Sequence, residues 1–242
     1  MKTKMKKLSV FILLIVVFAS CKNEPVEPVY RSIATVINPD GVRDYIFISD
    51  KGNRMKPTNA TQILKDRQRI VADFYIVDEK SDESNYDYDI QYVSLYSILT
   101  KEIFDVTPET QDSIGNDPVG IHQMWIGNDF LNIEFFFYAQ DKKHAVNLVS
   151  DANKTYDDDK VHLEFRHNAN RDFPSRTTWE LVSFDLRSLQ EDAVGDSVNI
   201  VIHTDEYGAS ETKKREFTYK FNSTENNLEP TIALQESSMT IE

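Results

Sequence analysis

The chain has 242 residues, with 27 lysines and arginines against 40 aspartates and glutamates, and a formal charge of −13. A surface this acidic repels phosphate backbones, so the composition excludes general nucleic-acid binding. Hydrophobic residues make up 40% of the chain, which is enough for a packed core and argues against a disordered protein. The single cysteine excludes a disulfide scaffold and a cysteine-ligated zinc site.

The N-terminal residues have the pattern of a bacterial export signal. Four lysines precede an apolar run from Leu8 to Phe18, which is too short to span a bilayer as an ordinary helix but suits a secretory signal. The run ends in Phe18-Ala19-Ser20-Cys21, which resembles a lipobox, and Cys21 stands where the lipid would be attached. We therefore predict a signal peptide at residues 1–20 and a lipid anchor on Cys21. The alternative is a plain signal peptide cleaved after Ser20.

Removal of the signal peptide would leave 23 basic against 40 acidic residues, a charge of −17. Acyl chains on Cys21 would hold the protein on a membrane without spanning it. Residues 21–30 are polar and contain Pro25 and Pro28, so we predict an extended tether there. We expect a cell-envelope protein on the outer membrane, either periplasmic or displayed on the surface.

The residues after the tether form short alternating apolar runs with almost no helical periodicity. Turn signals at residues 38–41 and 50–53 separate the first of these runs. About five short strands in about 80 residues fit a small barrel such as an OB-fold. We assign an OB-like barrel to residues 31–110, with a short helix near residues 59–66. The predicted strands of this domain are 32–37, 44–49, 68–77 and 89–100.

The segment from Pro108 to Pro118 is rich in residues that interrupt regular structure, so it is the predicted domain boundary. Six or seven further strands with turn signals between them predict an antiparallel β-sandwich in residues 111–242 and an all-β fold for the whole chain. A helical turn is expected only near residues 186–192. The predicted strands here are 130–138, 145–149, 161–167, 177–186, 198–204 and 215–221.

Several short motifs run along the chain in a fixed order: Ala34-Thr35-Val36, Asp50-Lys51-Gly52, Gln68-Arg69-Ile70-Val71, Leu99-Thr100-Lys101, Asp112 to Pro118, Trp125 to Asn132, His144 with Asn147-Leu148-Val149, and Leu163 to Ala169. Together they resemble the NigD-like family of Bacteroidetes lipoproteins. The resemblance implies an OB-like N-terminal domain, a C-terminal β-sandwich and an association with bacteriocin immunity. Two positions depart from the family pattern. Asp66-Arg67 stands where we expect glycine, and Phe130 stands where tyrosine is commoner.

No catalytic motif is present among the five histidines and the acidic residues. His-Glu-x-x-His and Gly-x-Ser-x-Gly patterns are absent. His162 and His167 are five residues apart on a predicted strand, so they point to opposite faces and would not share a metal. We predict a protein that is not an enzyme, with no cofactor and no metal site. Loose calcium binding at Asp157–Asp159 stays open, although Tyr156 and His162 stand where an EF-hand needs glycine and glutamate.

Four residues are candidates for ligand binding. Trp125 offers an aromatic platform near a turn, and Arg166, His167 and Asn168 offer hydrogen-bond donors at the end of a predicted strand. The alternative is structural: Trp125 would anchor the core, and Arg166 would pair with a carboxylate on a half-buried strand.

The sequence therefore predicts a non-catalytic, membrane-anchored β protein that binds another macromolecule. An acidic surface suits a basic toxin, which would be an immunity-type role. The alternative is a glycan or small-ligand binding module, since barrels and sandwiches both host oligosaccharide sites. An exposed row of aromatics with amide and guanidinium groups would favour a glycan. An acidic patch with an apolar centre would favour a protein partner.

Overall fold

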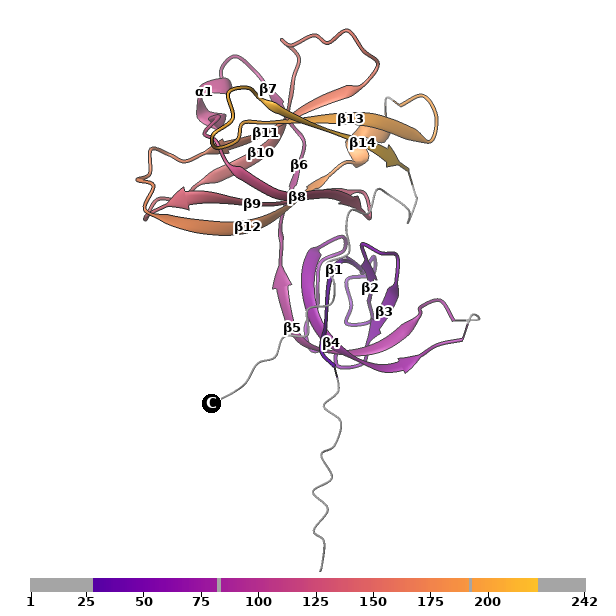
Figure 1. The fold of residues 1–242 in the computed structure, drawn as a ribbon. Helices are drawn as coiled ribbons and strands as arrows, with labels where there is room; N and C mark the ends of the chain where they lie inside the picture. Colours follow the sequence, from indigo (N-terminus) through magenta and orange to yellow (C-terminus); the bar gives the residue numbers. More distant parts are fainter. Residues whose placement is uncertain (1–27, 82–83, 192, 222–242) are drawn as a thin grey trace, which may run out of the picture.

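The computed structural model describes residues 28–81, 84–191 and 193–221, which form a barrel followed by two packed sheets (Figure 1). The signal peptide predicted at residues 1–20 and most of the tether lie outside the described residues. Within the described part, no helix is long and apolar enough to cross a membrane. The all-β fold predicted from the sequence is confirmed.

The barrel closes in the strand order β1-β2-β3-β5-β4. β3 and β5 run parallel and the other neighbours are antiparallel. Alternate side chains such as Val36, Phe47, Ile70 and Ile90 are buried in its interior. The segment at residues 59–66 has no helix, which corrects the prediction, and Asn59 instead bonds the backbone of Tyr92. The strands are β1 (Tyr30–Ile37), β2 (Ile46–Ser49), β3 (Arg54–Pro57), β4 (Arg69–Glu79) and β5 (Tyr88–Ser97).

The sandwich consists of a five-stranded sheet, β14-β13-β11-β10-β7, and a four-stranded sheet, β6-β12-β9-β8. A 3₁₀ helix at Arg187–Gln190 matches the predicted helical turn. The strands and helix are β6 (Leu99–Glu102), β7 (Phe104–Val106), α1 (Gln111–Ile114), β8 (Gly120–Gly127), β9 (Phe130–Ala139), β10 (Ala145–Asp151), β11 (Val161–Asn168), β12 (Arg176–Asp185), β13 (Ser197–Thr204) and β14 (Lys213–Lys220).

The sandwich is mixed rather than purely antiparallel, which corrects the prediction. β6 pairs parallel with β12, β7 with β10, and β11 with β13. Between β11 and β13 the sequence contains β12, which belongs to the other sheet. The chain therefore leaves the five-stranded sheet after β11 and returns to it in the same direction.

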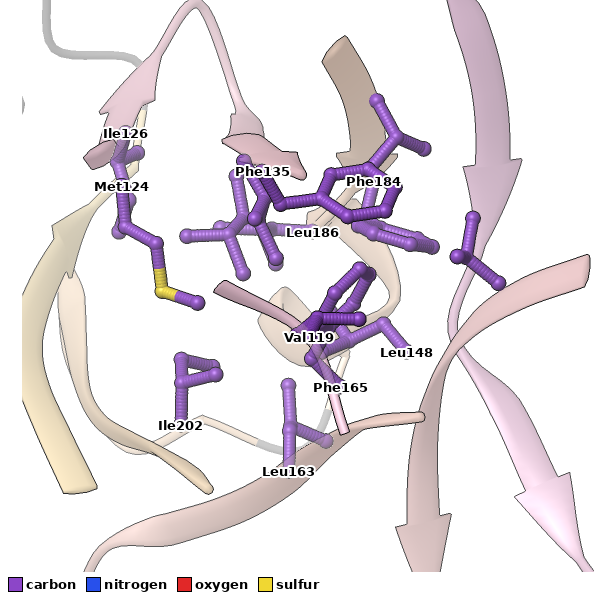
Figure 2. Packing of buried hydrophobic residues seen from close by; sticks show 14 of the residues in the cluster. Val119, Met124, Ile126, Phe135, Leu148, Leu163, Phe165, Phe184, Leu186 and Ile202 are labelled. Carbon is purple, nitrogen blue, oxygen red and sulfur yellow. The ribbon is translucent and has the colours of Figure 1, made fainter. Parts of the chain in front are cut away.

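The sandwich core lies between the two sheets, where side chains from both meet (Figure 2). Phe135 packs edge-on against Phe165 at a centroid distance of 5.1 Å, which joins β9 to β11. Phe184 of β12 lies 6.0 Å from the ring of Phe165. On each of these strands the residue next to the core side chain points to the other face of the sheet.

The change from barrel to sandwich occurs earlier than the predicted boundary between residues 110 and 111. Only Ile98 separates β5 of the barrel from β6, and both β6 and β7 pair with sandwich strands. Ile98 is buried, and its N–H donates to the carbonyl of Arg69 at 2.9 Å. The proline- and glycine-rich segment that suggested the boundary is a connection between β7 and β8 inside the sandwich.

Candidate functional site

The four-stranded sheet is the layer of the sandwich that faces the barrel (Figure 1). One side of this sheet fills the core, and the other side is called the outer face below. The end of the outer face near the β8–β9 turn contacts the barrel, and the other end of β9 and β12 extends past it. Strand register places on the outer face Gly120, Gln123 and Trp125 of β8, Asn132, Glu134, Phe136 and Tyr138 of β9, and Thr177, Trp179, Leu181 and Ser183 of β12.

A buried ion pair joins the barrel to the outer face. Arg69 has no exposed surface, and its guanidinium donates to both carboxylate oxygens of Asp50 at 2.7 Å. Its remaining N–H groups donate to Thr35 at 2.9 Å, Asn132 at 2.8 Å and Ser183 at 3.4 Å. All five guanidinium donors therefore have acceptors, which is what a buried arginine needs to be tolerated.

Trp125 and Asn132 extend this junction on the sandwich side. The indole N–H of Trp125 donates to Asp50 Oδ2 at 2.8 Å, so the same carboxylate accepts from both modules. Gly127 lies against this carboxylate, and a Cβ atom at that position would stand 2.5 Å from Cγ of Asp50. Only glycine allows β8 to approach the barrel this closely.

The β8–β9 turn also contacts the barrel. Asn128 and Asp129 have φ angles of 51° and 69°, and two consecutive positive φ values are what a two-residue type I′ hairpin requires. The side-chain amide of Asn128 donates to the carbonyls of Ile48 at 2.8 Å and Ser49 at 3.0 Å. The turn is therefore held against β2 by its own asparagine.

Both departures from the family pattern lie at this junction. Arg67 has a φ of 58°, in the left-handed region that glycine adopts freely, which explains why glycine is expected there. Its guanidinium lies 4.9 Å from the ring centroid of Phe130 and within 3.7 Å of the carboxylates of Asp129 and Asp185. The guanidinium of Arg69 also lies 5.0 Å from that ring. Phe130 therefore contacts two cations through its face.

The end of the outer face that extends past the barrel carries five connected rings, here called the aromatic cluster: His122, Phe136, Tyr138, Trp179 and Tyr207. The ring of Phe136 is central, with centroids 5.1 Å from Trp179 and 6.0 Å from Tyr207. Tyr138 lies 4.9 Å from Tyr207, and His122 meets Trp179 edge-on at 5.6 Å. Exposed fractions of 54%, 40% and 37% for Trp179, Tyr138 and Tyr207 make this an apolar surface open to solvent.

Backbone geometry fixes the aromatic cluster. The ring of Phe136 lies over Gly120 of the neighbouring strand, where a Cβ atom would stand 2.1 Å from the ring. Tyr207 comes from the β13–β14 connection, which bridges to the start of β8 through Val119 and Glu206. The hydroxyl of Tyr207 accepts a hydrogen bond from the backbone N–H of Tyr138 at 3.3 Å. Both sheets thus contribute to one rigid surface.

The four residues predicted to bind a ligand do not share one surface. Trp125 is 6% exposed and belongs to the junction, whereas the other three lie on β11 of the other sheet. Arg166 is buried and donates to Glu164 at 2.7–2.8 Å, as the structural alternative expected. His167 is buried beside the core, and Asn168 donates to the backbone carbonyl of Ser113 in α1 at 2.7 Å. Ligand binding by these residues stays a prediction.

Two chains of hydrogen-bonded histidines flank β11. In the first, His144 contacts His167 at 2.8 Å and Asp172 at 3.2 Å. If His144 donates to the carboxylate, its other nitrogen must accept the N–H of His167. Burial lowers the pKa of His167, and the neighbouring His144 lowers it further. Burial would raise the pKa of Asp172, but hydrogen bonds from the backbone of Gln140 and from His144 hold it well below its usual range.

The second chain lies on the opposite side of β11, as strand periodicity predicts. His203 contacts His162 at 2.8 Å, and His162 contacts Asp158 at the same distance. Tyr156 stacks on His162 at 3.6 Å beside a polar hollow of about 260 Å³. Burial lowers the pKa of His203, and the neighbouring His162 adds to this effect. Within the described part of the chain, no three His, Cys, Asp or Glu side chains converge as a metal site would require.

Comparison with known proteins identifies the sandwich. Residues 102–219 match the family model of the NigD-like C-terminal beta sandwich domain. The C-terminal half of this chain is a NigD-like sandwich. This confirms the resemblance found in the sequence motifs. Among proteins of curated function, none matches this chain.

Solved structures resemble both modules of the chain. A protein of unknown function from Bacteroides vulgatus is 25% identical, covers 86% of this chain and 99% of its own, and has a TM-score of 0.69. A protein named as toxin-related from Parabacteroides distasonis is 28% identical over 80% of this chain and 94% of its own, with a TM-score of 0.65. A NigD-like immunity protein from Bacteroides caccae shares the fold at 17% identity, covering 81% and 98%, with a TM-score of 0.58.

The junction was not predicted from the sequence, although several of its residues lie in the motifs quoted above. Asp50, Arg69 and Asn132 come from three separate motifs, and all three meet at the junction. Their presence in motifs was a signal, but nothing in the sequence indicated that the three would be neighbours. The sequence indicated the aromatic cluster only weakly. Aromatic residues on both faces of β9 are equally typical of a strand that is packed between two layers and has no exposed face.

Proposed function

We propose that this NigD-like chain is a non-catalytic cell-envelope protein, anchored through a lipid on Cys21, that binds another protein in an immunity-type role. The aromatic cluster carries the proposal, because large aromatic side chains are enriched in the cores of protein interfaces. The toxin-related and immunity proteins among the structural neighbours support a protein partner.

The polar chemistry of the described residues supports binding rather than catalysis. Each histidine chain ends on a carboxylate, as catalytic triads do, but neither includes a hydrogen bond to a serine or threonine hydroxyl in the described part. The most strongly hydrogen-bonded group, the Arg69–Asp50 pair, is buried at the junction, where it can position the modules but cannot reach a substrate.

A fixed junction favours binding because it reduces the entropy lost on association. The buried ion pair and the Asn128 contacts hold the barrel beside the outer face. A partner on the aromatic cluster therefore meets a surface that is already ordered, and less free energy is spent on arranging it.

Site-specific photo-crosslinking in intact cells tests this function. We would place p-benzoylphenylalanine at Tyr138, within the aromatic cluster, and at Tyr96, an exposed tyrosine of the barrel, as the matched control. The expected result is one discrete polypeptide adduct from position 138 and none from position 96. Equal adducts from both positions, or adducts with glycan alone, would contradict a protein partner at this surface.

A further inference from the structure

The outer face has almost no positive charge. β8 and β9 contain no lysine or arginine, and Arg176 of β12 is in register with Ala139, whose side chain lies on the core side. Glu134 lies on the outer face two residues before Phe136, and no cation or hydrogen-bond donor among the described residues pairs with it. A carboxylate and a group of rings thus share one face.

Trp179 and Glu134 are diagonal neighbours across the β9–β12 pair, because Glu134 is in register with Leu181. Diagonal neighbours in a sheet are close enough for a long side chain to contact both. The face of an exposed indole attracts a cation through its quadrupole, and a nearby carboxylate adds a charge-assisted hydrogen bond.

We infer that Trp179, Phe136 and Glu134 form a site for an arginine or lysine side chain from a basic segment of a partner protein. This inference rests on the proposed function and adds the chemistry of the partner. The net charge of −13 would attract such a segment and speed the encounter. The barrel already contacts the other end of the same face, so the partner would extend an existing interface.

A glycan fits this surface less well than a basic segment does. The centre of the aromatic cluster is the apolar ring of Phe136, and the outer face has no guanidinium group. The hydroxyl of Tyr207 already accepts a backbone hydrogen bond. An aromatic, apolar centre with polar groups at its edge is instead typical of a protein interface.

Peptide binding by the full chain tests the inference. The probes are a fluorescent (Gly-Arg)5 peptide, a (Gly-Glu)5 peptide and maltohexaose, measured by anisotropy or by tryptophan emission. We expect (Gly-Arg)5 alone to bind, and Trp179→Ala to weaken its binding about tenfold or more. Trp179→Phe should retain most of the affinity because it keeps a ring. Glu134→Gln should weaken binding and flatten its dependence on salt, and Tyr96→Ala should leave binding unchanged.

Three results would overturn the inference. If Trp179→Ala binds (Gly-Arg)5 as tightly as the original chain does, the peptide is attracted by general acidity and not by this site. If maltohexaose binds and Trp179→Ala abolishes that binding, the surface is a glycan platform. Failure of the peptide to bind, together with a protein adduct at position 138, would refute the basic segment but leave the proposed function intact.

Discussion

Arg69 has a structural role that its exposed counterpart in the barrel does not share. Both Arg69 and Arg31 form bidentate ion pairs with aspartates, but Arg69 is buried and the side chain of Arg31 is 67% exposed. A buried ion pair contributes little to the stability of the folded protein when both partners are present. Removing one partner leaves the other charge buried and unpaired, which is costly.

We predict that Arg69→Met lowers the free energy of unfolding by about 3–5 kcal/mol, because Asp50 then keeps a buried charge without its partner. Arg31→Met should cost less than about 1 kcal/mol, because water and salt already screen its pair with Asp73. Urea unfolding of the two variants measures both values. Equal losses in the two variants would show that the junction pair is no more important than a surface pair.

At the scale of elements, β11 links the two histidine chains to the sandwich. His167 points toward the core beside Phe137, and His162 points to the other side. A strand can hold both because successive side chains alternate between its faces. In each pair one N–H lies in the hydrogen bond between the two rings. Burial of His167 and His203 disfavours the addition of a second proton to either ring.

The pH dependence of stability follows from the lowered pKa values of His167 and His203. The ordinary pKa of about 6.5 applies to the unfolded chain, which therefore binds more protons than the folded chain just below that pH. We predict that the free energy of unfolding falls as the pH drops below about 6.5 toward the lowered pKa values. His167→Gln should reduce this slope without abolishing it, because His203 remains. Urea unfolding at several pH values measures the slope, and an unchanged slope would contradict the role of His167.

At the scale of the molecule, the acidic chain would act at a membrane surface. The structural description begins at residue 28, seven residues after Cys21. We predict that Cys21→Ala moves the protein from the membrane fraction to the soluble fraction, because the variant cannot carry the proposed acyl chains. Cell fractionation with immunoblotting measures this. Continued tight association with the membrane would refute the anchor, and a soluble variant that still unfolds cooperatively would confirm that folding is unaffected.

The sequence by itself determined the class of fold and most of the strands. Alternating apolar residues in a segment such as 68–77 report local burial, and burial on one face is a property of that segment alone. β3, β6, β7 and β8 were not predicted as strands of their own. The first three have only three or four residues, too few to show a period, and β8 contains a bulge near His122 that breaks it.

Tertiary structure alone decided which residues act together. Asp50, Arg69 and Asn132 are far apart in the sequence, and only barrel closure and the β8–β9 turn bring them into one hydrogen-bonded group. The same is true of Phe136, Trp179 and Tyr207, which come from two strands of one sheet and a loop. Periodicity shows which face of a strand is apolar, but it cannot show whether the core, the other module or solvent covers that face, because this depends on how distant segments pack.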